Sequence, residues 1–291
     1  MVAIDWGTSS CRAYRLDAAG VILERRDGPH GIAQIAGTFA DQLERLVGDW
    51  LDAGVEPVMM SGMIGSRNGW LEVPYLSCPA GAEEIAAGFK EVRWGGRRGW
   101  IAPGLMCRDG SGIPEVMRGE ETQIIGALDQ LPARATVCLP GTHSKWVLVR
   151  DGQIVSFTTY LTGEVFAILR DHSIIRHSIT AAAPDPDWFA AGLARARTAG
   201  GLLHHLFGVR TRGLFAEVPP EGAASYLSGI LIGHELAAVE LGPEAIFLLG
   251  AAPLTDHYRQ GLESIGRPAS VLDPDAAARG LERLARRWAK G

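Results

Sequence analysis

The chain has 291 residues, of which 47% are hydrophobic and 21% charged, and its formal net charge is −5 at pH 7. This composition excludes a disordered chain, because abundant aliphatic side chains can bury a core. The mildly acidic balance argues against nucleic acid or an anionic membrane as a partner. The 37 glycines exceed average usage and predict loops that turn sharply or approach a ligand closely.

Neither the cysteines nor the hydropathy pattern indicates a secreted or membrane protein. The four cysteines lie at no metal-ligand or redox spacing, so we expect reduced thiols and no zinc site. Charged residues within the first twenty positions argue against a signal peptide, and no apolar run approaches about 18 residues. We therefore expect a soluble, cytoplasmic protein.

Hydrophobic periodicity predicts alternating strands and helices along the whole chain. The predicted strands are residues 2–5, 12–16, 21–25, 57–60, 100–102 and 245–249. The predicted helices are residues 39–51, 83–92, 120–128, 187–198, 223–240, 254–265 and 275–290. Prolines and glycines between residues 103 and 118 are typical of a linker between domains.

An internal repeat relates residues 1–22 to residues 135–155. At one constant offset Gly7-Thr8 falls on Gly141-Thr142, and Ser10 falls on Ser144. Both copies are strand, Gly-Thr-x-Ser turn, strand, hairpin turn, strand. Such a repeat indicates duplicated architecture. We expect two matched lobes, residues 1–113 and residues 114–291, with the last helix packing back toward the first lobe.

The two Gly-Thr-x-Ser turns are candidate phosphate loops. Such a turn offers backbone N–H groups and hydroxyls, which bind anions well. Asp5 precedes the first turn, whereas Leu139-Pro140 precedes the second. Because hard cations prefer carboxylates and water, this asymmetry predicts one Mg²⁺ beside Asp5. The alternative is that the turns only connect hairpins and that Asp5 caps its turn.

Several longer segments carry a family resemblance. Ile4–Arg12 resembles the first phosphate loop of the sugar kinase, Hsp70 and actin superfamily, and Leu139–Trp146 resembles the second. Leu248–Ala252 is similar to its adenosine loop. Together with Ser61–Trp70 and Met117–Gln123, these segments resemble the 2-dehydro-3-deoxygalactonokinase family over nearly the whole chain.

The resemblance implies an α/β, two-lobed ribonuclease H-like (actin-like ATPase) fold with a duplicated mixed-sheet core and a central cleft. It implies a kinase that uses ATP and Mg²⁺ to phosphorylate the terminal hydroxyl of 2-dehydro-3-deoxy-D-galactonate, giving the 6-phosphate in galactonate catabolism. The gluconate-derived epimer or another sugar acid stays open as the substrate. Two other functions also stay open: a nucleotide-switched ATPase or binding protein, and a polyphosphate phosphatase. The oligomeric state is open, a homodimer being one option.

The catalytic groups follow from the same resemblance. Related carbohydrate kinases have a Gly-Asp at the position of Gly119-Glu120, which makes Glu120 the expected catalytic base, with Glu121 as an alternative. Paired acids at a helix start can instead simply interact with the helix dipole. Lys145 is expected to neutralise phosphate charge in the transition state.

The remaining candidate residues bind nucleotide or sugar acid. The expected cofactor-binding residues are Asp5, Gly7, Thr8, Ser9, Ser10, Arg12, Gly141, Thr142, His143, Ser144, Gly250 and Ala251. The expected substrate-binding residues are Ser61, Gly62, Met63, Ser66, Arg67, Asn68, Trp70, Arg118, Thr162 and Glu164.

An arginine fork suits the substrate carboxylate. Arg67 is the first candidate, and Arg12 and Arg118 are its rivals. Thr162 and Glu164 open a predicted helix, so they either reach the substrate or cap that helix.

Overall fold

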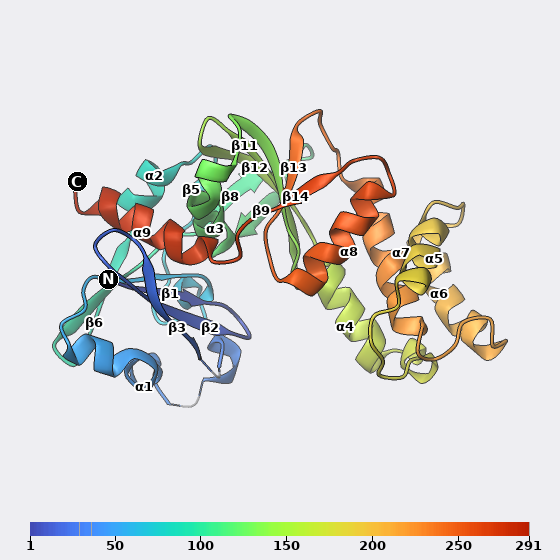
Figure 1. The fold of residues 1–291 in the computed structure, drawn as a ribbon, viewed down its shortest axis with the longest axis horizontal. Coiled ribbons are helices and arrows are strands. Elements are labelled where there is room, and N and C mark those ends of the chain that lie inside the picture. The colour runs from blue at the N-terminus through green and yellow to red at the C-terminus, as the bar shows by residue number, and fades with distance from the viewer. Residues whose placement is uncertain (29, 36, 291) are drawn as a thin grey trace. The chain divides into compact units, whose positions relative to one another are not determined.

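The computed structural model describes residues 1–28, 30–35 and 37–290. Contacts divide the chain into two compact units (Figure 1). Unit 1 comprises Met1–Ala135, Val147–Thr158 and Leu272–Gly291, and unit 2 comprises Thr136–Trp146 and Thr159–Val271. This division differs from the expected boundary between residues 113 and 114, because the chain passes between the units several times. The last helix belongs to unit 1.

The main sheet of unit 1 has six strands in the order β3-β2-β1-β4-β7-β6. β1 pairs antiparallel with β2 and parallel with β4, and Asp5 lies opposite Ser61 in the parallel register. The carboxyl ends of these two strands therefore coincide. The strands are β1 (Val2–Trp6), β2 (Cys11–Leu16), β3 (Ile22–Gly28), β4 (Val58–Ser61), β6 (Lys90–Trp94) and β7 (Arg97–Ile101).

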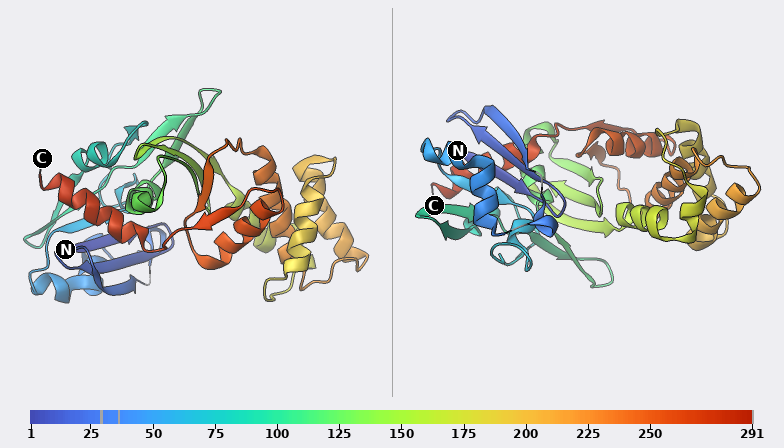
Figure 2. Two further views of the ribbon diagram at one scale, coloured as in Figure 1. Left: turned by 45° about the horizontal axis from the view of Figure 1, so that its top comes forward. Right: turned by 90° about the horizontal axis from the view of Figure 1, so that it is seen from below.

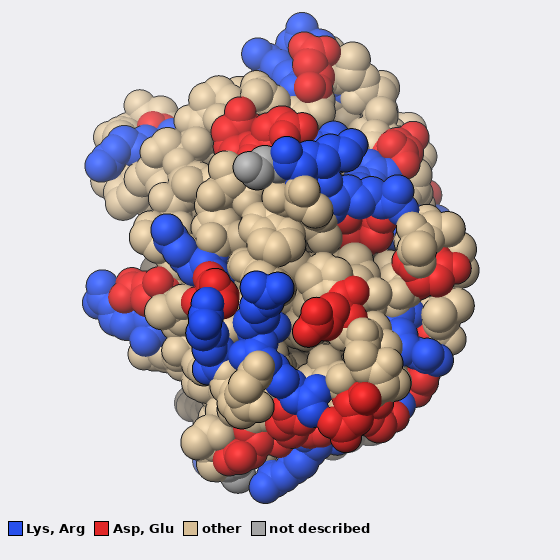
Figure 3. Space-filling view, turned by 90° about the vertical axis from the view of Figure 1, so that its left-hand side faces the viewer, with Lys and Arg blue, Asp and Glu red and all other residues tan. Residues whose placement is uncertain are grey.

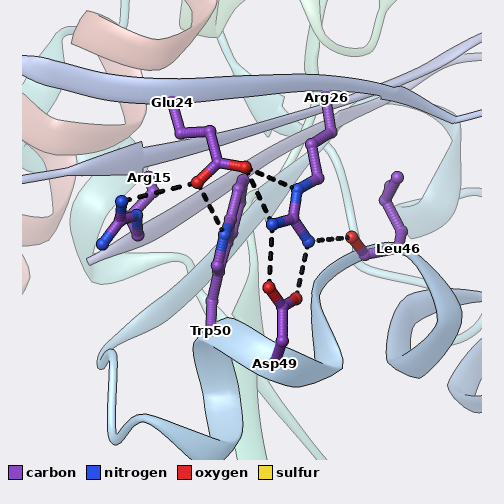
Figure 4. Close-up of polar contacts among 6 residues, drawn as sticks. All are labelled: Arg15, Glu24, Arg26, Leu46, Asp49 and Trp50. Carbon is purple, nitrogen blue, oxygen red and sulfur yellow. Dashed lines mark hydrogen bonds and ion pairs between the residues drawn. The ribbon is translucent and has the colours of Figure 1, made fainter.

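Helix α1 is tied to the edge of this sheet by a polar network (Figure 4). The Arg26 guanidinium on β3 donates to both carboxylate oxygens of Asp49 on α1, at 2.6 and 2.8 Å. It also donates to Glu24, whose other carboxylate oxygen accepts from Trp50 Nε1 at 3.1 Å. Beneath the network, the apolar face of the helix enters the core of unit 1. The helix is α1 (Phe39–Asp52).

The predicted helix over residues 83–92 is correct only in its first half. α2 (Ala82–Ala87) ends at Gly88, and the following residues form strand β6. Gly95 and Gly96 both have positive φ, 49° and 80°, and they turn the chain tightly from β6 into β7. The alternating pattern of a hairpin strand therefore prevails over the helical spacing that the sequence suggested.

The predicted linker over residues 103–118 is wrong, because this segment forms a β-hairpin inside unit 1. β8 (Leu105–Arg108) pairs antiparallel with β9 (Pro114–Met117), and β5 (Leu76–Ser77) completes a small sheet. The Asp109 carboxylate accepts from two backbone N–H groups of the connecting turn. The glycines of this segment thus serve a turn and not a domain boundary.

Two helices of unit 1 pack backbone to backbone, α3 (Glu120–Ala127) and α9 (Ala276–Trp288). A Cβ on Gly126 would lie 1.8 Å from the Ala276 carbonyl oxygen, and a Cβ on Gly280 would lie 1.9 Å from that of Thr122. In the left view of Figure 2, the red α9 lies beside the green α3. Because no side chain fits between the two helices at these positions, the glycines determine how closely α9 packs against α3.

The second sheet repeats the topology of the first. Its order is β12-β11-β10-β13-β14, which corresponds strand by strand to β3-β2-β1-β4-β7. The repeat predicted from the two Gly-Thr turns is thereby confirmed as a duplicated core. The strands are β10 (Arg134–Leu139), β11 (Ser144–Arg150), β12 (Gln153–Tyr160), β13 (Ala245–Leu248) and β14 (Ala269–Val271).

Unit 2 also holds a group of helices. α5 and α7 approach closely, since a Cβ on Gly192 would lie 2.3 Å from the Tyr226 carbonyl oxygen. The sequence did not predict α6, which leaves Leu203 and Phe207 largely exposed and so lacks a clear apolar face. The helices are α4 (Thr162–His172), α5 (Pro186–Ala196), α6 (Gly201–Leu214), α7 (Ala223–Ala238) and α8 (Ala252–Glu263).

One face of the surface, drawn in space-filling view, carries side chains of both charges. On the face shown in Figure 3, Lys and Arg side chains alternate with Asp and Glu, so both signs lie beside one another. Within the described part of the chain, no helix is both long and apolar enough to span a bilayer.

We predict that Gly280→Ala destabilises the protein by about 1–3 kcal/mol, the usual cost of overpacking a tight contact. The added methyl group would meet the Thr122 carbonyl oxygen and push α9 away from α3. Gly208→Ala on α6 is the matched control, because its methyl group would meet no atom within 4 Å. That control is expected to stabilise by about 0.4–1 kcal/mol. Urea unfolding of both variants checks this, and equal effects would contradict the close contact.

Candidate active site

Three backbone segments of unit 1 meet at the carboxyl end of β1. Gly62, which follows β4, has φ +93°, and a Cβ there would lie 2.7 Å from the Trp6 carbonyl oxygen. Gly119, which precedes α3, has φ +111°, and its Cβ would lie 3.2 Å from Gly62 Cα. Only glycine combines such φ angles with such close approach. The N-terminus of α3 therefore lies next to the end of β1.

This contact brings two carboxyl groups near each other. The Asp5 side chain is 14% exposed, and its carboxylate lies 3.8 Å from Arg12 Nη1. Burial raises the pKa of Asp5 to about 6, Arg12 opposes that rise, and the negative charge of Glu120 adds to it. Asp5 and Glu120 thus form an acidic pair at the end of β1.

The two glutamates at the start of α3 have different surroundings. Glu121 is fully buried, and its carboxylate accepts from Gly119 N at 2.7 Å and from Thr122 Oγ1 at 3.1 Å. Burial raises the pKa of Glu121 to about 8, and the neighbouring Glu120 adds to the rise. Glu120 is partly exposed and accepts from Arg118 N at 3.0 Å. Of the two, Glu120 is therefore the carboxylate within reach of a ligand.

The first candidate phosphate loop is a tight turn held by backbone hydrogen bonds from residues 32 and 33. Gly7 N donates to the Ser10 carbonyl at 2.8 Å, and the three residues after Gly7 are exposed. The Gly7 and Thr8 carbonyls accept from Ile32 N and Ala33 N. A Cβ on Gly31 would lie 2.3 Å from the Thr8 carbonyl oxygen, so this packing against the turn requires glycine at position 31.

Buried polar groups lie at and beneath the segment Ser61–Trp70. The hydroxyls of Ser61 and Ser66 are buried and have no hydrogen-bond partner among the described residues. Arg118 is 7% exposed, and Nη2 donates to the Val73 carbonyl at 2.6 Å, while Nε and Nη1 have no partner in that set. The Tyr75 ring lies 4.3 Å from the guanidinium carbon and covers it.

The other predicted residues of this segment lie at its surface or against the core. Arg67 and Asn68 are exposed, and Arg67 lies 3.8 Å from the Glu72 carboxylate. Trp70 packs against Phe39 and so joins the core of unit 1. Met63 is half-buried in the short turn after β4. The structure therefore places the candidate arginines Arg67 and Arg118 in opposite environments.

In unit 2, the second candidate phosphate loop packs on the start of α4. A Cβ on Gly163 would lie 2.3 Å from the Gly141 carbonyl oxygen, and Glu164 N donates to the Thr142 carbonyl at 2.9 Å. The side chains of His143 and Glu164 lie 2.5 Å apart. Of the two residues that were predicted to reach the substrate or cap their helix, Glu164 thus contacts this loop, and Thr162 donates to Glu235 instead.

The strand that follows the loop carries two buried polar side chains. Ser144 Oγ donates to Glu235 at 2.9 Å, and Lys145 Nζ donates to the His143 carbonyl at 3.2 Å. The loop at Gly250 lies beside the same turn, since a Cβ on Gly250 would lie 3.4 Å from the Pro140 carbonyl oxygen. Ala251 is exposed at the start of α8. The predicted adenosine loop and the second phosphate loop are therefore neighbours.

A cavity of about 620 Å³ lies within unit 2, next to these loops. It is bounded by Gly141, by α4, α7 and α8, and by the segment between Ile179 and Pro184. Its walls are largely apolar, with a few polar groups including Ser228 and His257. This size and lining suit a drug-sized organic ligand.

Sequence motifs missed two features of unit 2. The cavity walls on α7 and α8 belong to no motif, because their positions meet only in the folded chain. Glu235 was also missed, although one signal was available: it is the only acidic residue in the otherwise apolar helix α7. A lone carboxylate in such a helix is buried and needs partners.

No group of three or more His, Cys, Asp or Glu side chains among residues 1–28, 30–35 and 37–290 is arranged to hold a metal ion. An ion at Asp5 would need other ligands, such as water and phosphate oxygens.

Comparisons with known proteins agree with the resemblance in sequence. The model of the 2-keto-3-deoxy-galactonokinase family matches residues 5–284. The 2-dehydro-3-deoxygalactonokinase of Escherichia coli (strain K12) is 37% identical over 280 residues, 95% of this chain and 94% of that protein. The probable 2-dehydro-3-deoxygalactonokinase DgoK1 of Rhizobium meliloti (strain 1021) is 38% identical over 298 residues, covering 98% of this chain and 96% of that protein.

Solved structures share the fold. A Sinorhizobium meliloti protein provisionally assigned as a 2-dehydro-3-deoxygalactonokinase aligns with a TM-score of 0.87 and 34% identity, covering 98% of both chains. More distant structures of the actin-like ATPase and sugar kinase fold align at TM-scores of 0.52 to 0.55 and 12 to 14% identity. The chain therefore has the actin-like ATPase fold that the sequence predicted.

We predict that Glu121→Gln gains stability relative to the unchanged protein as pH rises from 5 to 8. The folded-state pKa of Glu121 is raised to about 8 from 4.5, so between these values the carboxyl group ionises in the unfolded chain but stays protonated in the folded protein, and the stability of the folded state falls as pH rises. Gln does not titrate, and Asp5 is present in both proteins. The difference should grow by more than about 1 kcal/mol, since one pKa unit corresponds to about 1.4 kcal/mol. Urea unfolding at pH 5, 6.5 and 8 tests this, and a pH-independent difference would refute the burial argument.

Proposed function

The chain belongs to the 2-keto-3-deoxy-galactonokinase family, and we propose that it transfers the γ-phosphoryl group of ATP to the terminal hydroxyl of 2-dehydro-3-deoxy-D-galactonate. The product is the 6-phosphate, which places the reaction in galactonate catabolism. The observation that carries the proposal is the acidic pair Asp5 and Glu120 at the end of β1. A coupled assay of ADP formation, run over a panel of six-carbon sugar acids, tests the activity and separates the epimers.

Glu120 is the proposed catalytic base. Phosphoryl transfer needs positioning, charge neutralisation and a group that accepts the hydroxyl proton. As the hydroxyl oxygen bonds to the γ-phosphorus and the bond to ADP breaks, the hydroxyl proton passes to Glu120. The partial exposure of Glu120 supports this role, whereas Glu121 is enclosed and bonded to its own helix terminus.

The residues at the end of β1 suit a Mg²⁺ ion. The raised pKa of Asp5 reflects a carboxyl group held in a buried place beside the charge of Glu120, which a cation would relieve. Mg²⁺ usually binds one or two carboxylates, water and substrate phosphates, so Asp5 can serve without a further protein ligand. When bound, the ion would neutralise phosphate charge.

Unit 2 is the proposed nucleotide-binding part. The apolar cavity beside Gly141 has room for a nucleoside, and backbone N–H groups of the Gly141–Ser144 turn would bind phosphate. Lys145 directly follows this turn and would supply positive charge to the phosphates. A cytoplasmic location fits the use of ATP and the four free cysteine thiols.

Arg118 is the proposed partner of the sugar-acid carboxylate. Two nitrogens of its buried guanidinium have no partner among the described residues, and this leaves a desolvation cost that a carboxylate would offset. Arg67 is exposed and already lies near Glu72, so an added ion pair there contributes little.

We predict that Glu120→Gln lowers kcat by about 10²- to 10⁴-fold, the range expected for loss of a general base. The KM values for both substrates should change little, because the amide keeps the size of the side chain. Glu121→Gln is the comparison and should retain most of the turnover. The coupled assay measures both variants. Full turnover in Glu120→Gln, or a larger loss in Glu121→Gln, would move the base to another residue.

We predict that Arg118→Gln raises the KM for the sugar acid at least tenfold, because a charge-assisted bond to the carboxylate is lost. The KM for ATP should stay within about threefold. Arg67→Gln is the matched control and should change neither value by more than about threefold, as expected for an exposed charge. The reverse result, a large effect of Arg67→Gln alone, would assign the carboxylate to Arg67.

A further inference from the structure

Glu235 is a buried carboxylate that gathers four donors from three other elements of unit 2. It lies near the end of α7 and is 3% exposed. Oε1 accepts from Trp146 Nε1 at 2.7 Å. Oε2 accepts from Ser144 Oγ at 2.9 Å, from Tyr258 OH at 2.7 Å and from Thr162 Oγ1. Such a set of donors offsets the cost of burying a charge.

Three of these donors border the second phosphate loop or the cavity. Ser144 is the last residue of the Gly-Thr-x-Ser turn and the first of β11. Thr162 opens α4, whose next residue packs against the Gly141 carbonyl. Tyr258 lines the cavity from α8. One carboxylate therefore joins the loop, the helix that supports it and the cavity wall.

The hydrogen bonds also decide where the hydroxyl protons point. A serine or threonine hydroxyl has one proton to donate. In this structure Ser144 Oγ has two protein acceptors, Glu235 at 2.9 Å and the Tyr160 carbonyl at 3.4 Å, and Thr162 Oγ1 donates to Glu235, so neither hydroxyl proton points to a phosphate oxygen. Burial and the charge of Glu235 raise the pKa of Tyr258 well above its ordinary value, which keeps its phenol a donor.

We propose that Glu235 is a positioning residue for nucleotide binding: through Ser144 and Thr162 it holds the second phosphate loop in register with the cavity beside it. This inference rests on the proposed function, since it takes the loop and the cavity to bind ATP. All four donors belong to unit 2, whereas Arg118, the proposed partner of the sugar-acid carboxylate, belongs to unit 1. Loss of the carboxylate should therefore weaken ATP binding and leave sugar-acid binding nearly unchanged.

The test is Glu235→Gln, which preserves the shape of the side chain. Its amide oxygen can still accept from Trp146, but its amide NH₂ faces three hydroxyls that must turn round to accept. We expect the dissociation constant of ATP, measured by calorimetry on the folded protein, to rise at least tenfold. The KM for the sugar acid should stay within threefold.

Trp146→Phe is the matched control, because it removes one donor to Glu235 without altering the hydroxyls at the loop and α4. It should lower the midpoint of thermal unfolding and leave the dissociation constant of ATP within threefold. Ser144→Ala should weaken ATP binding, and in combination with Glu235→Gln its effect should be smaller than the sum of the two. A role through Ser144 requires that non-additivity, and additive effects on the dissociation constant of ATP would contradict it.

Two results would overturn the proposal. One is an ATP dissociation constant in Glu235→Gln within threefold of that of the unchanged protein, whatever the loss of thermal stability. The other is equal weakening of ATP and sugar acid. The binding measurement is independent of turnover, so inactivity of the unchanged protein toward every sugar acid tested would refute the proposed function and leave this result interpretable.

Discussion

The close approach of three backbones at the end of β1 is the constraint on which the candidate chemistry of unit 1 depends. Gly62 packs against the Trp6 carbonyl so closely that a Cβ there would lie only 2.7 Å away, and Gly119, with φ +111°, packs against Gly62 at 3.2 Å. Because the segments touch directly, the first turn of α3 stands beside the last residues of β1. Asp5 and Glu120 then interact electrostatically although more than a hundred residues separate them in sequence.

The helix that carries Glu120 is held from its other side by a second contact of the same kind. Gly126 and Gly280 let α3 and α9 meet backbone to backbone, so the last helix of the chain supports the helix that begins at Glu120. At the start of that helix, two adjacent carboxyl groups also differ in how deeply they are buried. Glu121 is enclosed and satisfies the helix terminus, which leaves Glu120 partly exposed for chemistry.

In unit 2 a buried carboxylate lies beside the candidate phosphate loop, whereas in unit 1 close backbone contacts at glycines surround the end of β1. Its candidate phosphate loop is also packed tightly, through Gly163, and Ser144 at the end of that loop donates to the Glu235 carboxylate. A buried charge is costly unless fully bonded, so an arrangement that satisfies it is strongly preferred over looser ones. The duplicated sheets therefore carry two candidate phosphate loops whose surroundings differ: backbone contacts at glycines in unit 1, and a buried carboxylate beside the loop in unit 2.

The amino-acid sequence by itself determined the elements that depend on local pattern. The Gly-Thr repeat predicted the duplicated sheet, and the spacing of apolar residues predicted most helices, because both signals lie within short stretches of chain. Where two local patterns competed, as over residues 83–92, the prediction was half correct. The hairpin of β8 and β9 was mistaken for a linker, since glycine and proline mark turns of both kinds.

Only the tertiary structure decided which of the candidate side chains are buried, and therefore which are available. Sequence alone could not separate Glu120 from Glu121 or Arg67 from Arg118, because each pair has the same chemistry and differs only in surroundings. The cavity and the role of Glu235 depend on residues from several elements that meet on folding. Burial and partnership are set by long-range packing, and no local pattern in the chain encodes them.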